Sequence, residues 1–130
     1  MPATEIMHTC IRVLDEQRSV AFYRALGFEE RDRKRVGRDT ATIIFLGLPG
    51  DGNRLELTVN DGRTEPYDVG TGYGHIALAI PDLASELERL APLGITPERE
   101  PYVSGPGGSL ICFVRDPDEY RIELIHTGGR

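Results

Sequence analysis

Two histidines and two glutamates occur at matched intervals along this sequence of 130 residues. The interval from His8 to Glu56 equals the interval from His75 to Glu123. Each glutamate stands between apolar neighbours, in RLEL (54–57) and RIEL (121–124). Imidazole nitrogen and carboxylate oxygen together suit a borderline divalent metal such as Ni, Co, Mn, Fe or Zn. If the chain brings the two pairs together, the spacing predicts one metal site with four protein ligands.

The matched spacing extends along most of the chain, because the register that places His8 on His75 superposes its two halves without a gap. The identical residues include His8/His75, Asp15/Asp82, Leu26/Leu93, Gly27/Gly94, Val36/Val103, Ile44/Ile111, Asp51/Asp118, Arg54/Arg121, Glu56/Glu123 and Leu57/Leu124. Such a repeat indicates a duplicated supersecondary unit. We therefore expect residues 1–130 to form one domain of two modules, at about 5–60 and 73–127. The connector between them, 61–72, is rich in turn-forming residues.

Each module has the same predicted order of elements, βαβββ, which places the fold in the α+β class. Asp15 and Asp82 are the predicted N-caps of the two helices, because aspartate is a preferred N-cap residue. Gly27 and Gly94 are predicted to end these helices. Runs of β-branched and apolar residues predict the strands. Their ranges are 7–15, 28–35, 41–47 and 53–60 in the first module, and 75–82, 95–100, 109–115 and 120–126 in the second.

Strand side chains alternate between two faces, and the alternation puts the polar residues together. In the first module His8 shares a face with Cys10 and Arg12, and Glu56 shares a face with Thr58 and Asn60. The opposite faces are apolar, and we expect them to pack against the helices. The polar face suits the floor of a cavity better than a core.

The second module repeats this arrangement around His75 and Glu123. Small residues, Ala77 and Ala79, share the face of His75 and leave room above the sheet. His126 has the opposite parity to Glu123, so we do not expect it to be a ligand. A simpler interpretation stays open, because a lone strand histidine is usually a hydrogen-bonded structural residue and a duplication copies structural residues as well.

Composition limits the classes of partner. The net charge of −6, with both signs mixed along the chain, argues against nucleic acid as the main partner. Two cysteines without a CxxC pair form neither a disulfide framework nor a thiolate metal site. We recognise no signal peptide at the N-terminus and no apolar run of about 20 residues that would span a membrane. We expect a soluble, cytoplasmic protein.

Several longer motifs resemble one family. The segments HTCIRVLDEQRSVAFYRALGF, LELTVNDG, GTGYGHIAL and FVRDPDEYRIELI are similar, in this order, to signatures of the vicinal oxygen chelate superfamily. Within it they most resemble lactoylglutathione lyase, glyoxalase I, of the short bacterial type. The resemblance covers nearly the whole chain. It implies a curved mixed sheet of the glyoxalase/bleomycin-resistance kind, whose paired modules enclose a cavity.

The resemblance also implies a site and a reaction. The metal ligands would be His8, Glu56, His75 and Glu123, with one divalent metal per site, most often nickel in the short bacterial enzymes and otherwise Zn, Co or Mn. Arg12 and Asn60 would hold glutathione. The reaction converts the hemithioacetal of methylglyoxal and glutathione to S-D-lactoylglutathione by proton transfer through an ene-diolate, with Glu123 as the base and Glu56 as the alternative. A homodimer with shared sites is implied.

Two departures from the family pattern leave alternatives open. Many relatives carry a lysine in the loop at 102–109 that can meet an anionic end of the thiol, and this sequence has none there. Glu119 occupies a turn position that glycine often holds. The identity of the thiol co-substrate is therefore open. Because a fold does not fix function, four alternative functions also stay open: a thioester epimerase, a thiol transferase, a ring-cleaving dioxygenase and a non-enzymatic drug-binding protein.

Overall fold

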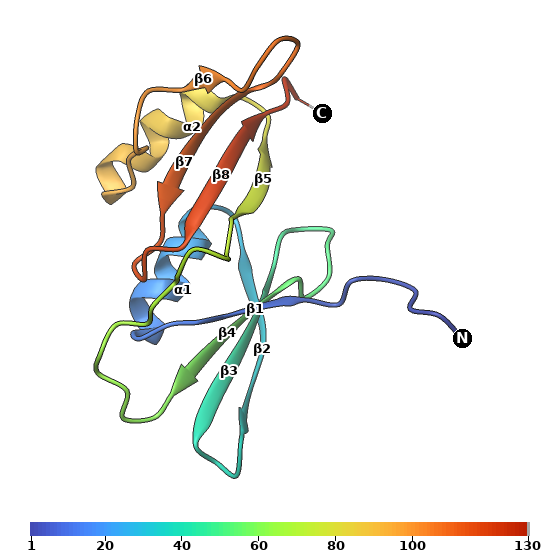
Figure 1. Cartoon of the computed structure of the whole chain (residues 1–130), viewed down its shortest axis with the longest axis vertical. Coiled ribbons are helices and arrows are strands. Elements are labelled where there is room, and N and C mark those ends of the chain that lie inside the picture. The colour runs from blue at the N-terminus through green and yellow to red at the C-terminus, as the bar shows by residue number, and fades with distance from the viewer. Residues whose placement is uncertain (130) are drawn as a thin grey trace. The chain divides into compact units, whose positions relative to one another are not determined.

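The computed structural model describes residues 1–129, which form two compact units. The first unit is Met1–Asp68, and the second begins at Val69. Each unit holds one four-stranded mixed sheet and one α-helix (Figure 1). The observed order of elements is βαβββ in both, with a short 3-10 helix after the second α-helix. The predicted α+β class is confirmed.

The first unit places its first and last strands side by side. Its elements are β1 (Thr9–Arg12), α1 (Glu16–Ala25), β2 (Glu29–Val36), β3 (Ala41–Gly47) and β4 (Leu55–Asn60). The strand order is β1-β4-β3-β2, with β1 parallel to β4 and the other neighbours antiparallel. Cys10 lies opposite Glu56 in this register, so a residue near position 8 comes close to position 56.

The second unit repeats the topology. Its elements are β5 (Ile76–Ile80), α2 (Leu83–Leu90), the 3-10 helix η1 (Ala91–Leu93), β6 (Tyr102–Val103), β7 (Leu110–Arg115) and β8 (Arg121–His126). The strand order is β5-β8-β7-β6, and β5 runs parallel to β8. Ala77 lies opposite Glu123, as Cys10 lies opposite Glu56 in the first unit.

Both helices begin where the sequence predicts, and α1 also ends as predicted, whereas α2 ends at Leu90 and Gly94 instead caps the short 3-10 helix that follows it. The side chain of Asp15 accepts a hydrogen bond from the backbone N–H of Arg18, 3.0 Å away, and Asp82 caps α2 in the same way. Gly27 follows the C-cap of α1 with φ +109°, a conformation that favours glycine. Neither helix is long or apolar enough to cross a membrane, within residues 1–129.

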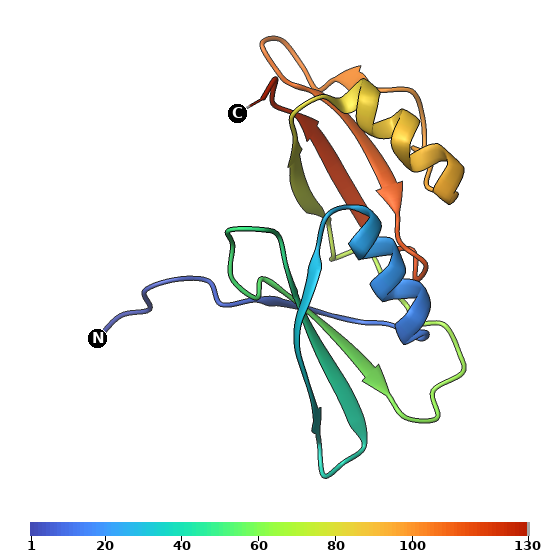
Figure 2. The same ribbon diagram turned by 180° about the vertical axis from the view of Figure 1, so that it is seen from behind.

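One face of the first sheet is buried beneath α1. Ile44, Leu46, Leu55 and Leu57 on this face are at most 2% exposed. Arg33 lies opposite Ile44 in the register and bonds Glu16 in the first turn of α1, so the helix lies on this side of the sheet. Figure 2 shows each helix beside the sheet of its own unit. Burying one such leucine or isoleucine stabilises the fold by about 1.5–3 kcal/mol.

The second sheet is buried in the same manner, and His126 belongs to its buried side. Leu83 and Leu90 of α2 are fully buried, as are Ile122 and Leu124 of β8. Nδ1 of His126 accepts a hydrogen bond from the backbone N–H of Leu83, at a distance of 3.1 Å. His126 therefore satisfies an N–H at the start of α2, on the face opposite to Glu123.

The strand predicted at 95–100 is wrong. This segment is irregular, and the short strand β6 at Tyr102–Val103 pairs with β7 instead. Pro97 and Pro101 explain the error, because proline has no N–H to donate to a strand ladder. The predicted strands at 7–15 and 75–82 are also shorter, and His8 and His75 each lie one residue before their strand.

The expectation of a repeat without a gap is wrong at one place. Phe45 lies opposite Glu56 and Phe113 lies opposite Glu123, so these phenylalanines are structural counterparts. The register that aligns Glu56 with Glu123 would instead place Phe45 on Cys112. Cys112 pairs with Leu124 and is the true counterpart of Ile44, in place of Ile111. Compared with the first unit, the second unit has one extra residue before β7, and its turn between β7 and β8 is one residue shorter than the turn between β3 and β4.

Candidate metal and substrate site

His8 and Glu56 form the first of two equivalent pairs. Nε2 of His8 lies 3.2 Å from Oε1 of Glu56, and the side chains are 37% and 13% exposed. The pair lies on the open face of the first sheet, because Leu55 and Leu57 on either side of Glu56 point into the core. The imidazole is reachable from solvent while the carboxylate is mostly sheltered by its neighbours.

A short chain of hydrogen bonds continues from Glu56. The hydroxyl of Thr58 donates to Oε2 of Glu56 at 2.8 Å, and Sγ of Cys10 lies 3.2 Å from the same hydroxyl oxygen. Burial is the first cause of a raised pKa of the Cys10 thiol, and the neighbouring Glu56 carboxylate raises it further. A raised pKa disfavours the thiolate, which is the nucleophilic form of cysteine, so the site gives Cys10 no activation as a nucleophile.

His75 and Glu123 form the second pair with nearly the same geometry. Nε2 of His75 lies 3.0 Å from Oε1 of Glu123, and the side chains are 38% and 15% exposed. The position equivalent to Thr58 is Ile125, which has no hydroxyl. Within residues 1–129, Glu123 therefore accepts no hydrogen bond comparable to the one from Thr58. The two pairs match in position and differ in how firmly their carboxylates are held.

An aromatic ring supports each histidine. The ring centroids of His8 and Phe45 are 5.4 Å apart, and those of His75 and Phe113 are 5.1 Å apart, both in an edge-to-face arrangement. A cation then lies over each phenylalanine: Lys34 over Phe45 and Arg121 over Phe113. These contacts restrict the orientation of each imidazole and keep Nε2 directed toward its glutamate.

The open face of the first sheet also carries the predicted substrate residues. Arg12 lies opposite Thr58 in the register, and Asn60 follows two residues later on the same face. The side-chain amide of Asn60 donates to the hydroxyl of Tyr67 at 2.9 Å, which ties β4 to the segment that follows it. His8, Glu56, Arg12 and Asn60 are thus brought to one face, as the alternation of side chains predicts.

Lys34 on the same face was not anticipated from the sequence. It lies opposite Ile43, which in turn lies opposite Thr58. It is the only lysine in the chain, and its ammonium has no ion pair among residues 1–129. Alternation along β2 places Lys34 on the open face, but every residue of the run RDRKR is charged, so the sequence does not distinguish Lys34 as a substrate-binding residue.

The donor atoms of each pair fit a borderline divalent metal, although each pair supplies only two ligands. Such metals take four or more, from imidazole nitrogen and carboxylate oxygen among others. Within residues 1–129, no cluster of three or more histidine, cysteine, aspartate or glutamate side chains is arranged to hold a metal ion. Each unit therefore brings together two donor side chains, fewer than such a metal takes.

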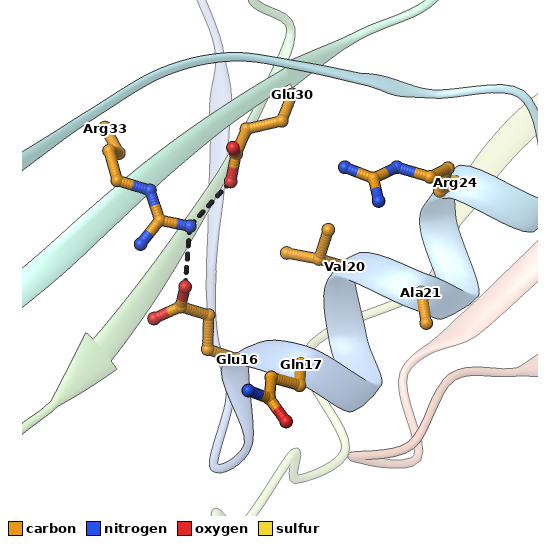
Figure 3. A pocket seen from close by; sticks show the side chains of 7 residues that line it. All are labelled: Glu16, Gln17, Val20, Ala21, Arg24, Glu30 and Arg33. Atoms are coloured by element: carbon orange, nitrogen blue, oxygen red, sulfur yellow. Dashed lines mark hydrogen bonds and ion pairs between the residues drawn. The ribbon is translucent and has the colours of Figure 1, made fainter.

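A hollow of about 290 Å³ lies on the other side of the first sheet, between α1 and β2 (Figure 3). Arg33 spans it, bonding Glu16 at 2.6 Å and Glu30 at 2.7 Å. Val20 and Ala21 of α1 form its apolar wall. Because this hollow is on the helix side, it does not include His8 or Glu56.

Comparison with protein families gives one match along most of the chain. Residues 5–124 match the glyoxalase/bleomycin resistance protein/dioxygenase superfamily. A probable lactoylglutathione lyase of Synechocystis is 38% identical over 128 residues, covering 96% of this chain and 97% of the relative. A lactoylglutathione lyase of Salmonella typhimurium is 39% identical over 125 residues, covering 94% of this chain and 92% of the relative.

Solved structures agree with these relatives. Glyoxalase I from Zea mays matches with a TM-score of 0.83 and 35% identity over 94% of this chain, which spans 44% of the maize chain. A trypanothione-dependent glyoxalase I from Leishmania major matches with a TM-score of 0.76 and 34% identity, covering 95% of this chain and 87% of the other. Family match, curated relatives and solved structures together show that the chain belongs to the glyoxalase/bleomycin resistance protein/dioxygenase superfamily, among the lactoylglutathione lyases.

Proposed function

We propose that this protein is a metal-dependent glyoxalase I, a carbon–sulfur lyase that converts the hemithioacetal of methylglyoxal and a thiol to the S-D-lactoyl thioester. The observation that carries the proposal is the pair of matched His–Glu contacts, 3.2 Å and 3.0 Å long, on the open faces of two duplicated sheets. Relatives of nearly equal length are lactoylglutathione lyases.

The metal would be held by His8 and Glu56 together with His75 and Glu123. It would act as a Lewis acid that stabilises negative charge on the oxygens of the reacting substrate. Two imidazoles and two carboxylates give the charge and hardness that Ni, Co, Mn or Zn prefer, and nickel is our first expectation. The ligand set requires that the two units contribute to one site.

The base that moves the proton would be one of the two glutamates. Removing a proton from a carbon next to a carbonyl requires a carboxylate within hydrogen-bond reach, and the same group must return the proton to the adjacent carbon. We assign this step to Glu123, with Glu56 as the alternative. The carboxylate would take the proton at the oxygen nearest the reacting carbon and deliver it to the neighbouring carbon.

The substrate's thiol portion would be bound by the first sheet. Arg12 presents a planar fork of donors that suits a carboxylate, and Asn60 adds an amide on the same face. Lys34 on β2 supplies a second cation three strand spacings from Arg12 on β1, or about 14 Å between the two backbones at the usual strand spacing. A peptide thiol such as glutathione, with carboxylates at both ends, is long enough to meet both cations.

The identity of the thiol is the least constrained part of this proposal. The relative from Leishmania major is trypanothione-dependent, so members of this family differ in the thiol they use. The loop at 102–109 has no lysine. We propose that Lys34, on the open face of the first sheet, supplies a positive charge to the thiol, and we expect glutathione to be accepted.

A homodimer is part of the proposal, with the first unit of one chain facing the second unit of the other. Each dimer would then have two shared sites. We expect a small-molecule substrate, no nucleic acid and no membrane partner, and a cytoplasmic location.

Other chemistry on this scaffold is the second candidate. A thioester epimerase or a thiol transferase would keep a metal at the same site, whereas a ring-cleaving dioxygenase needs only two histidines and one carboxylate. A drug-binding relative would need no metal-ligating side chains. The presence of both His–Glu pairs favours the lyase over the dioxygenase and the drug-binding protein.

The test combines metal content with turnover. The protein is stripped, reconstituted with Ni, Co or Zn, and analysed by mass spectrometry, and thioester formation from methylglyoxal and glutathione is then followed by ultraviolet absorbance. We expect one metal per chain and turnover that Glu123→Gln abolishes while the circular dichroism spectrum stays unchanged. Metal without turnover on any thiol would favour an epimerase or transferase, and absence of metal binding would favour a drug-binding protein.

A further inference from the structure

The two His–Glu pairs differ in one contact, and this difference assigns a role to a residue outside the ligand set. Oε1 of Glu56 faces His8, while Oε2 accepts the hydroxyl proton of Thr58 at 2.8 Å. Oε1 of Glu123 faces His75, but the counterpart of Thr58 in the second unit is Ile125. Within residues 1–129, the second carboxylate has no such support on its other oxygen.

The direction of the hydrogen bonds follows from their chemistry. An ionised carboxylate only accepts hydrogen bonds, so the single hydroxyl proton of Thr58 is donated to Glu56. The Thr58 oxygen is then free to accept, and the thiol of Cys10 at 3.2 Å is the donor. Cys10 and Thr58 thus form a chain of two hydrogen bonds that ends on the acceptor Oε2 of Glu56 and leaves Oε1 directed at His8.

We propose that Thr58 is a positioning residue that fixes the carboxylate of Glu56 for metal binding. This inference rests on the proposed function. A hydroxyl that holds one carboxylate oxygen orients the other toward the metal, and loss of such an outer contact weakens metal binding by about 10- to 100-fold.

The experiment measures metal affinity directly, without turnover. Full-length wild-type protein and Thr58→Val are titrated with nickel in competition with a chromogenic chelator. Valine keeps the shape and removes only the hydroxyl, and we expect the affinity to fall about tenfold. Thr58→Ser, which restores a hydroxyl, should recover most of the loss.

A matched control removes a hydroxyl from the other face of the same sheet. Thr42 accepts a hydrogen bond from Arg35 at 2.9 Å and lies away from the His–Glu pair. Thr42→Val should therefore bind nickel as the wild-type does. Melting temperatures of the metal-free variants show whether each one is folded.

The outcomes separate the two proposals. If wild-type and Thr58→Val bind nickel within twofold of one another, the positioning role is wrong while the proposed function stands. If Thr42→Val or Thr58→Ser loses as much affinity as Thr58→Val, the effect is general to the sheet and the positioning role is again wrong. If the wild-type binds no nickel, cobalt or zinc, the metal-dependent function fails and the role of Thr58 fails with it.

Discussion

Nζ of Lys34 lies 5.7 Å from the ring centroid of Phe45, and that ring lies edge-to-face with His8. A cation, an aromatic ring and a candidate ligand thus follow one another across the open face of the first sheet. Because the ammonium is exposed and has no ion pair among residues 1–129, it is available to an anionic substrate.

Lys34→Met should weaken substrate binding without changing the chemical step. We expect KM for the glutathione hemithioacetal to rise about fivefold with kcat unchanged, because the lost contact is the same in the ground state and the transition state. Arg33→Gln is the control, since it removes one positive charge from the next residue, which faces α1. A change in kcat, or an equal rise in KM for Arg33→Gln, would contradict the role of Lys34.

Complementation between two inactive variants tests whether sites are shared between chains. His8→Ala and His75→Ala should each abolish turnover alone. When the two are unfolded together and refolded, a dimer with one chain of each kind contains one site with both histidines intact. Random pairing should then restore about a quarter of the wild-type activity. No recovery above the sum of the separate variants would show that each site is built within one chain.

The turn at Glu119 should be stabilised by glycine. Glu119 has φ +74°, in the left-handed region that costs a non-glycine residue about 1–2 kcal/mol. Its carboxylate lies 3.4 Å from Arg115, but it is exposed and this pair contributes little. Glu119→Gly should therefore raise the free energy of unfolding by about 0.5–1 kcal/mol after the extra entropy of glycine is included.

Chemical denaturation of the metal-free protein measures this change. Glu119→Ala is the matched variant, because it also removes the carboxylate but keeps the Cβ atom that causes the strain. We expect no stabilisation from alanine. Equal stabilisation by glycine and alanine would mean that the side chain, and not the backbone conformation, is responsible.

Much of this fold could be predicted because the determining signals are local. Asp15, Asp82 and Gly27 act through their own helix termini, and the alternation around Glu56 and Glu123 is a property of any half-buried strand. The strand predicted at 95–100 is wrong because Pro97 and Pro101 have no N–H to donate to a strand ladder, and Ile95 is the one aliphatic residue in this segment.

The contacts that support the two pairs could not be predicted in the same way. Phe45 and Phe113 are counterparts only through the strand register, which an alignment of the halves without a gap conceals. Thr58 was placed on the correct face, but its hydrogen bond to Glu56 depends on a rotamer that no spacing determines. Lys34 needed the register of β2 with β3 to be distinguished from its charged neighbours.

The ion pairs of Glu98 with two arginines should make the free energy of unfolding decrease at low pH. It accepts hydrogen bonds from Arg121 at 2.8 Å and from Arg115 at 2.6 Å, and the Arg121 contact is the first cause that lowers the pKa of this carboxyl below its ordinary value of 4.5. A carboxyl with a lowered pKa in the folded state stabilises the protein above its unfolded-state pKa. That contribution is lost as the pH falls through the folded-state value.

Glu98→Gln should therefore lower the free energy of unfolding by about 0.5–1 kcal/mol at pH 7, a modest value because Glu98 and both arginines are partly exposed. The difference from wild-type should shrink as the pH falls below the ordinary carboxyl pKa of 4.5 and through the lower pKa of the folded state, where the wild-type carboxyl also becomes protonated. Urea denaturation of the metal-free protein between pH 3 and pH 7 measures both curves. Curves that stay parallel across this range would show that Glu98 contributes through packing and not through its charge, because a packing contribution does not depend on protonation.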